Sequence, residues 1–199
     1  MSLFAKPYVV HAMIETGING FGRFGLHLLK YWLDRNSDSS FKISFINDDS
    51  IDIYKAREII LNDRYVKFNK YKVEVSGDNL VILEPNGGKH EIFYTNFEQK
   101  KIPWIGDPKI FFECSGKFTV AKKCSVYLKG NTKTVIISAT SWDADKTIVY
   151  GYNHEEYSSK LKVISFGSCT VNAYLPFANW IDKKYGILDS DVNVIHNIQ

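Results

Sequence analysis

The stretch that decides the fold is Gly20-Phe-Gly22-Arg-Phe-Gly25, whose glycines follow the pattern G-x-G-x-x-G. Before it, residues 14–18 form a short run containing β-branched residues, which predicts a strand. After it, residues 23–36 place apolar side chains three and four positions apart, the spacing of an amphipathic helix. The order of strand, glycine turn and helix is typical of the first unit of a parallel α/β sheet.

The rest of the chain continues this alternation. We expect a strand at residues 41–46, N-cap chemistry within residues 47–50 and a helix ending near residue 61. Turn residues then separate three short strands of an antiparallel meander, at residues 71–75, 80–84 and 91–94. The α/β pattern resumes with expected strands at residues 109–114, 133–139, 147–152, 162–165 and 192–195 and expected helices at residues 119–129 and 169–185.

These elements predict an α/β fold of the Rossmann type, a doubly wound and mainly parallel sheet with an inserted antiparallel meander. Residues 13–168 would form this dinucleotide-binding domain. Residues 169–199 would begin an incomplete α+β substrate domain, and residues 1–12 would be an extension, a tag or a mis-assigned start. Pro176 predicts a kink in the last helix.

Composition excludes several classes of protein. The chain has 199 residues, of which 45% are hydrophobic, enough for one sizeable domain or for one domain and part of a second. A net charge of +3, evenly spread, argues against a nucleic-acid partner. No stretch approaches the roughly 18 apolar residues of a membrane span, and no signal-peptide core forms. Three cysteines without paired spacing predict no metal site and a reducing, cytoplasmic compartment.

The glycine turn predicts a site for a dinucleotide pyrophosphate. Gly20 would allow the sharp turn, Gly22 would let the backbone approach the phosphates, and Gly25 would let the helix pack closely. Asp48, 23 residues after Gly25, ends the next predicted strand, where a carboxylate can bind the adenine ribose. Because its charge repels a 2′-phosphate, NAD is favoured over NADP. Alternatively, the glycines only make a tight turn, and Asp48 or Asp49 only caps a helix.

Cys169 is the candidate nucleophile. It lies at the predicted N-terminus of a helix, where free N–H groups and the helix dipole stabilise a thiolate. His196, 27 residues later, is the candidate base, because a helix followed by a returning strand can bring it back to that level. Alternatively, Cys169 is a small buried hydrophobe, although its neighbours Gly167, Ser168 and Thr170 are poor core residues.

The other cysteines and histidines are expected to have structural roles. Cys114 and Cys124 fall within apolar patterns and should pack in the core. The remaining histidines have no convergent partners in the sequence, and we expect them at the surface or in turns: His11, His27, His90 and His154.

Seven segments, in this order, carry a resemblance to a known family. They are Ile18-Asn-Gly-Phe-Gly-Arg-Phe-Gly25, Ile46-Asn-Asp48, Ile102-Pro-Trp104, Glu113-Cys-Ser-Gly116, Val135-Ile-Ile-Ser-Ala139, Asn153-His154 and Ser168-Cys-Thr-Val-Asn172. Through them the chain resembles the phosphorylating glyceraldehyde-3-phosphate dehydrogenases over roughly residues 14–196. The last segment, with a downstream histidine, is far more specific than the glycine turn.

The resemblance implies a mechanism. Cys169 would attack an aldehyde carbon to give a thiohemiacetal, with its backbone N–H helping to hold the oxyanion. His196 would raise the thiolate content and take the hydroxyl proton as hydride leaves for NAD. Inorganic phosphate would then cleave the thioester, with Ser168 and Thr170 contributing to phosphate binding. The residues that this resemblance and the glycine motif assign to the cofactor are Gly20, Gly22, Arg23, Phe24, Gly25, Asn47, Asp48, Ser115, Gly116, Phe118 and Ser138.

The chain also departs from the family pattern. Leu26 stands where the family usually has Arg, Thr140 where it has Pro, Ala173 where it has a second Cys, and Ile198-Gln199 where it has a Thr-bearing tail. The aldehyde could therefore be glyceraldehyde 3-phosphate or another phosphorylated aldehyde.

Family members also continue well beyond His196, into a substrate domain with a phosphate-gripping arginine. We therefore expect little or no turnover from these 199 residues alone. The alternative function is a non-catalytic NAD-binding or interaction module. Self-association or a homo-oligomer is expected from one apolar helix face, which carries Val171, Leu175, Phe177, Ala178 and Trp180.

Overall fold

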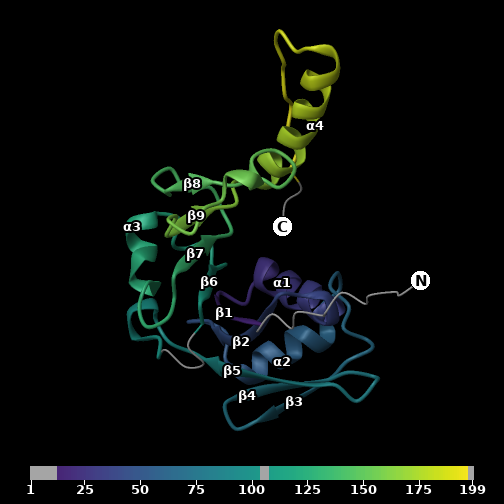
Figure 1. Cartoon of the computed structure of the whole chain (residues 1–199). Helices are drawn as coiled ribbons and strands as arrows, with labels where there is room; N and C mark the ends of the chain where they lie inside the picture. The colour runs from purple at the N-terminus through teal and green to yellow at the C-terminus, as the bar shows by residue number, and fades with distance from the viewer. Residues whose placement is uncertain (1–12, 104–107, 197–199) are drawn as a thin grey trace, which may run out of the picture.

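The computed structural model describes residues 13–103 and 108–196 and contains a nine-stranded sheet (Figure 1). The spatial order of the strands is β3-β4-β5-β2-β1-β6-β7-β9-β8. His11, Trp104, Ile198, Gln199 and the expected extension at residues 1–12 lie outside the described residues. The strands are β1 (Ile14–Asn19), β2 (Phe41–Asn47), β3 (Lys72–Ser76), β4 (Asn79–Leu83), β5 (Lys89–Thr95), β6 (Ile110–Glu113), β7 (Thr134–Ile137), β8 (Lys146–Thr147) and β9 (Val163–Ser165).

Four α-helices accompany the described strands. They are α1 (Arg23–Asp34), α2 (Ile53–Asn62), α3 (Ala121–Cys124) and α4 (Cys169–Tyr185). Short 3-10 turns occur at Asn36–Asp38, Gln99–Lys101, Ser125–Tyr127 and His154–Glu156. Within the described part of the chain, no helix combines the length and the apolar character needed to cross a bilayer.

The pairing of the strands confirms a doubly wound sheet with an antiparallel insertion. Central strand β1 pairs in parallel with β2 on one side and with β6 on the other. β4 pairs antiparallel with β3 and β5, so the expected meander is present, and it joins the main sheet through a parallel β5–β2 pair. The chain moves outward from β1 through β2 and then returns to β6 on the opposite side. Ligands bind at the carboxyl ends of the strands beside such a switch point.

Both faces of the sheet are buried at β6 and β9. Along β6 and β9, successive side chains enter two different apolar clusters, because a strand points neighbouring residues to opposite faces. Phe112 and Ile164 pack in the cluster that contains the buried residues of α1 and α2. Phe111 and Val163 pack in the cluster that contains Ala121 and Cys124 of α3. This layering confirms the α/β class and explains why β6 and β7 carry apolar residues at successive positions.

Four local expectations were wrong, and the first concerns a helix. The helix expected at residues 119–129 is only the four-residue α3 followed by a 3-10 turn. The carboxylate of Asp143 accepts hydrogen bonds from the first amides of α3, at Ala121 and Lys122. The tighter turn that follows brings Tyr127 into the core, where its hydroxyl reaches Glu113.

The strand expected at residues 147–152 is wrong beyond Thr147, where β8 ends. The side chain of Asn153 turns the chain there, because it donates to the Thr147 carbonyl and accepts from the Val149 amide.

The segment at residues 192–195, expected to be a strand, is exposed and pairs with no strand among the described residues. The N-cap of α2 is Asp52, whose carboxylate accepts from the Lys55 amide at 2.8 Å, and lies outside residues 47–50.

Candidate active site

The three motif glycines differ in what surrounds them. Gly20 has a φ of +95°, and an added Cβ would lie 2.3 Å from the Ser115 backbone nitrogen. A Cβ on Gly25 would lie 2.2 Å from the carbonyl oxygen of Gly20, because α1 begins against the turn. A Cβ on Gly22 would meet no atom within 4 Å. A tight turn therefore accounts for Gly20 and Gly25 but gives no packing reason for Gly22.

The N-terminus of α1 opens beside Gly22. Gly22 is the N-cap of α1, no side chain caps the helix, and its first turn contains no acidic residue. The first amides of a helix lack intrahelical partners and carry a partial positive charge. They are therefore available to an anionic group such as a phosphate.

Asp48 joins the glycine turn to the loop that follows β2. Its carboxylate is buried, with 8% of the residue exposed, and accepts from the backbone amides of Phe21 (2.7 Å), Ser50 (2.8 Å) and Ile51 (2.9 Å). Asp48 therefore does not cap α2. A carboxylate has about four acceptor positions, so three amide donors leave room for a further hydroxyl.

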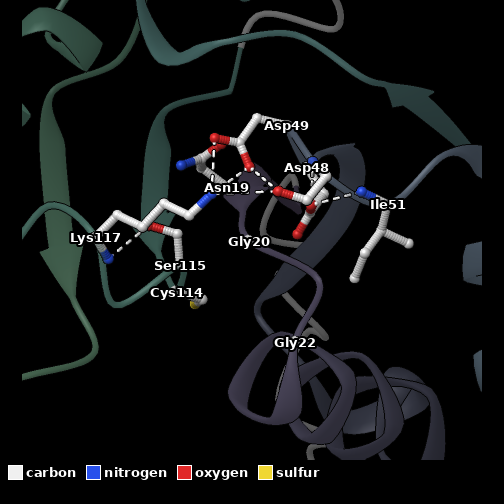
Figure 2. A pocket seen from close by; sticks show the side chains of 10 residues that line it. Asn19, Gly20, Gly22, Asp48, Asp49, Ile51, Cys114, Ser115 and Lys117 are labelled. Carbon is white, nitrogen blue, oxygen red and sulfur yellow. Dashed lines mark hydrogen bonds and ion pairs between the residues drawn. The ribbon is translucent and has the colours of Figure 1, made fainter.

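A first cavity of about 140 Å³ lies at the carboxyl ends of β1, β2 and β6 (Figure 2). It unites the glycine turn with Asp48 and Ser115, which are far apart in sequence. Figure 2 also shows Asp49 and Lys117 at this cavity. Its lining consists of Asn19, Gly20, Gly22, Asp48, Asp49, Ser50, Ile51, Cys114, Ser115 and Lys117.

A second cavity, of about 570 Å³, opens beyond β7 and β9. It brings Phe24 of α1 and Ser138 from the end of β7 together with Ser168 and Cys169. The remaining lining residues are Ala139, Thr140, Phe166, Gly167 and Asn172. Since α1 contributes Phe24 here and the turn before it contributes Gly22 to the first cavity, the N-terminus of α1 stands between the two.

Cys169 is the first residue of α4 and is exposed, so it is not a buried small hydrophobe. Ser168 caps the helix by accepting a hydrogen bond from the Val171 amide at 3.1 Å. The side-chain amide of Asn172 donates to the backbone carbonyls of Phe166 (2.5 Å) and Ser168 (2.9 Å), and these bonds hold the preceding loop in place. The thiol is thus presented to the second cavity at a fixed helix N-terminus.

Cys114 and Cys124 are buried, as expected. Burial raises the pKa of both thiols, and raises that of Cys124 to about 12. Among the described residues, His, Cys, Asp and Glu side chains form no group suited to a metal ion.

The chain matches the family model of the glyceraldehyde 3-phosphate dehydrogenase NAD-binding domain over residues 14–121. It belongs to the glyceraldehyde-3-phosphate dehydrogenase family. It is 34% identical over 186 residues to the glyceraldehyde-3-phosphate dehydrogenase of Cochliobolus lunatus, covering 93% of this chain and 53% of the relative. For the same enzyme of Podospora anserina the identity is 34% over 185 residues, covering 92% of this chain and 52% of the relative. The chain spans about half the length of these relatives.

Other residues assigned from the family resemblance lie away from the linings of the two cavities. Arg23 forms an ion pair with Asp63 at 3.2 Å, and its guanidinium lies over the Tyr65 ring. Asn47 is buried, and its side-chain amide donates to Asn19 (2.8 Å) and to the Phe97 carbonyl (2.9 Å). In this structure both residues support the framework around the site.

Three more assigned residues flank the site. Gly116 has a φ of +72° in the loop after β6. Phe118 is half-buried and packs against the core cluster beneath α3. Thr170 is the second residue of α4 and is half-buried.

His196 is exposed, in the segment that follows α4. Figure 1 shows the chain reversing direction beyond that helix. Within the described residues, no hydrogen bond joins His196 to Cys169, so the pairing of base and nucleophile stays a prediction.

The expectation for His90 was wrong: it is half-buried, with Glu84 hydrogen-bonded to its ring and Trp32 packed edge-on at 5.0 Å. His27 is exposed, and His154 lies in a turn, as expected.

Glu113 is a functional neighbour that sequence reasoning missed. Only 1% of it is exposed, and burial raises the pKa of its carboxyl group. The carboxyl group accepts from the Asn19 amide (2.8 Å), the Ser115 backbone (2.8 Å) and the Tyr127 hydroxyl (2.5 Å). It thereby fixes two residues that line the first cavity. An acidic residue at the end of an apolar strand was the signal that could have revealed it.

Proposed function

We propose that the chain binds NAD across the two cavities and that Cys169 is the nucleophile in the oxidation of a phosphorylated aldehyde. The observation that carries this proposal is the open space at Gly22. Uncapped amides of α1 adjoin it, and a cavity lies on either side. Because folding alone gives no packing reason for a glycine here, the space is best explained by the close approach of a pyrophosphate.

The residues present fit this cofactor. Asp48 would accept a hydrogen bond from the adenine ribose in the first cavity, and its charge would favour NAD over NADP. The amides at the start of α1 would hold the pyrophosphate. Phe24 and Ser138 would line the nicotinamide half in the second cavity.

The chemistry follows from the position of Cys169. Cys169 is the first residue of α4 and faces the second cavity, where its sulfur would attack the aldehyde carbon to form a thiohemiacetal. The backbone N–H of Cys169 would help to hold the oxyanion, and His196 would take the hydroxyl proton. NAD, when bound, would supply the acceptor for the hydride that leaves the thiohemiacetal carbon. A thioester would then remain on the Cys169 sulfur. Inorganic phosphate, held in part by Ser168 and Thr170, would then displace the thiolate and release an acyl phosphate.

A specific observation favours a second candidate, an NAD-binding or interaction module without turnover. None of the residues of α4 is buried. Among the described residues, Cys169 therefore stands on a helix that little of the chain covers. The apolar side chains of α4 would then mediate self-association or the formation of a homo-oligomer. Either function would operate in the cytoplasm.

Equilibrium binding and turnover test these proposals together. Calorimetry with NAD should show saturable binding that Gly22→Val weakens. Formation of NADH from glyceraldehyde 3-phosphate and phosphate then separates the two candidates. Turnover that is lost in Cys169→Ser supports the catalytic function, whereas binding without turnover supports the module. A folded chain that does not bind NAD contradicts both.

A further inference from the structure

Lys117 and Asp49 meet at the first cavity from two separate loops. Lys117 follows β6 and Asp49 follows β2, yet the Lys117 ammonium lies 2.6 and 2.9 Å from the two carboxylate oxygens of Asp49. The same nitrogen also donates to the Ser50 hydroxyl at 3.2 Å. Figure 2 shows this contact beside Asp48, and all four residues line the cavity. The ion pair therefore closes part of the cavity wall.

The charges at this cavity are already matched to one another. Lys117 is the only cation among the lining residues that the structure describes, and it is engaged by Asp49. Asp48 is held by three backbone amides. The hydrogen bond between Lys117 and Asp49 lowers the pKa of Asp49 and raises that of Lys117, so both stay charged near neutral pH. An anionic ligand entering here meets two carboxylates and no free ammonium.

We propose that the Lys117–Asp49 ion pair determines which nucleotide the first cavity accepts. While Asp49 binds the Lys117 ammonium, that ammonium is not available to a phosphate, and the cavity prefers an unphosphorylated ribose. When Asp49 is replaced by an uncharged residue, Lys117 becomes an anchor for a 2′-phosphate. This inference rests on the proposed function, because it assumes that the adenosine half of a dinucleotide occupies this cavity.

The physical argument concerns the 2′ position of the ribose. An acidic residue at the end of the second strand of such a sheet binds the ribose 2′-hydroxyl, and here that residue is Asp48. Lys117 pairs with Asp49, the next residue along the chain, so its ammonium would lie close to the 2′ position of a ribose held by Asp48. A neutral hydroxyl competes poorly with Asp49 for a lysine, whereas a phosphate forms a charge-assisted bond.

The pair is also free to open. The side chains of Lys117 and Asp49 are 51% and 31% exposed, and ion pairs this accessible to water are weak. A 2′-phosphate that opened the pair would still face the freed Asp49 as well as Asp48. The rejection of NADP by the native chain therefore depends on repulsion, and removing one negative charge should relax it.

The test compares the dissociation constants of NAD and NADP, measured by calorimetry on variants of the full chain. Asp49→Asn should tighten NADP by about tenfold relative to NAD, because it removes a competitor and a repulsive charge together. Lys117→Met should weaken NADP relative to NAD. The double variant should lose the gain seen in Asp49→Asn. Circular dichroism verifies that each variant is folded.

Matched controls use an exposed ion pair elsewhere in the sheet. Lys89 and Glu91 pair near the amino end of β5, away from the first cavity. Glu91→Gln and Lys89→Met repeat the two charge changes and should leave the ratio of the two dissociation constants unchanged. The proposal is overturned if these controls shift the ratio as much as the test variants, or if the double variant keeps the gain. A folded native chain that binds neither nucleotide instead refutes the proposed function itself.

Discussion

The two cavities are built in different ways. Around the first, polar groups are buried and matched across strands, as with Asp48 and Glu113. Around the second, Cys169 stands at the start of α4, a helix without a buried residue that projects away from the sheet in Figure 1. The first cavity is thus formed by the core of the sheet, and the second by a helix terminus at its margin.

This difference suits the first cavity to holding a ligand in position and the second to presenting a reactive thiol. Groups fixed by several buried hydrogen bonds hold a ligand at little cost in entropy, which suits the recognition of a cofactor. A thiol at an exposed helix N-terminus is accessible to a substrate, which suits attack on a carbonyl carbon. Segments with few buried contacts also open with low free energies, so α4 should be the less stable region.

The largest expected effect is in cysteine reactivity. Iodoacetamide should label Cys169 roughly a thousandfold faster than Cys114 or Cys124, because only Cys169 is exposed and burial disfavours the other two thiolates. Mass spectrometry of peptides after timed labelling measures the three rates. In urea the rates should converge, which serves as the control. Equal rates in the folded chain would remove the contrast between the two cavities.

A second effect is on stability at the first cavity. Gly25→Ala should lower the free energy of unfolding by roughly 3 kcal/mol, since the new methyl group overlaps the Gly20 carbonyl. Gly22→Ala is the matched control and should cost about 1 kcal/mol or less, because its Cβ meets nothing and only the N-cap preference for Gly over Ala is lost. Urea denaturation followed by circular dichroism measures both. Similar losses in the two variants would show that packing requires all of the glycines.

A third, smaller effect concerns binding alone. Gly22→Val should weaken NAD by about tenfold, because the added side chain enters the space assigned to the pyrophosphate, while the melting temperature falls by only a few degrees through the poorer N-cap. Calorimetry and thermal unfolding measure the two quantities on one sample. Unchanged affinity would mean that the phosphates bind elsewhere.

The smallest effect is expected in association. Phe177 and Trp180 of α4 are 59% and 56% exposed, so replacing both with Ser should shift the chain toward monomer. Light scattering over a range of concentrations measures this change. The control replaces the exposed Tyr31 and Tyr54 of α1 and α2 with Ser, which should leave the average mass unchanged. A native chain that is already monomeric would contradict the expectation.

Much of the fold could be predicted because its signals are local. The glycine turn, the alternation of strands and helices and the turn residues of the meander each reflect short-range backbone preferences. Two of the failures occurred where a side chain outside the segment decided the outcome. Asp143 caps α3, and Asn153 ends β8 by bonding to a chain segment that would otherwise continue as a strand.

The candidate site divides in the same manner. The sequence by itself determined the glycine turn, the Asp48 position and a cysteine at a helix N-terminus, since each depends on neighbours along the chain. Only the tertiary structure decided that Glu113 supports the first cavity, that Lys117 closes on Asp49, and that Gly22 alone among the three glycines lacks a packing role. These facts depend on parallel strands that bring the ends of β1, β2 and β6 together, and such contacts leave no periodic trace in the sequence.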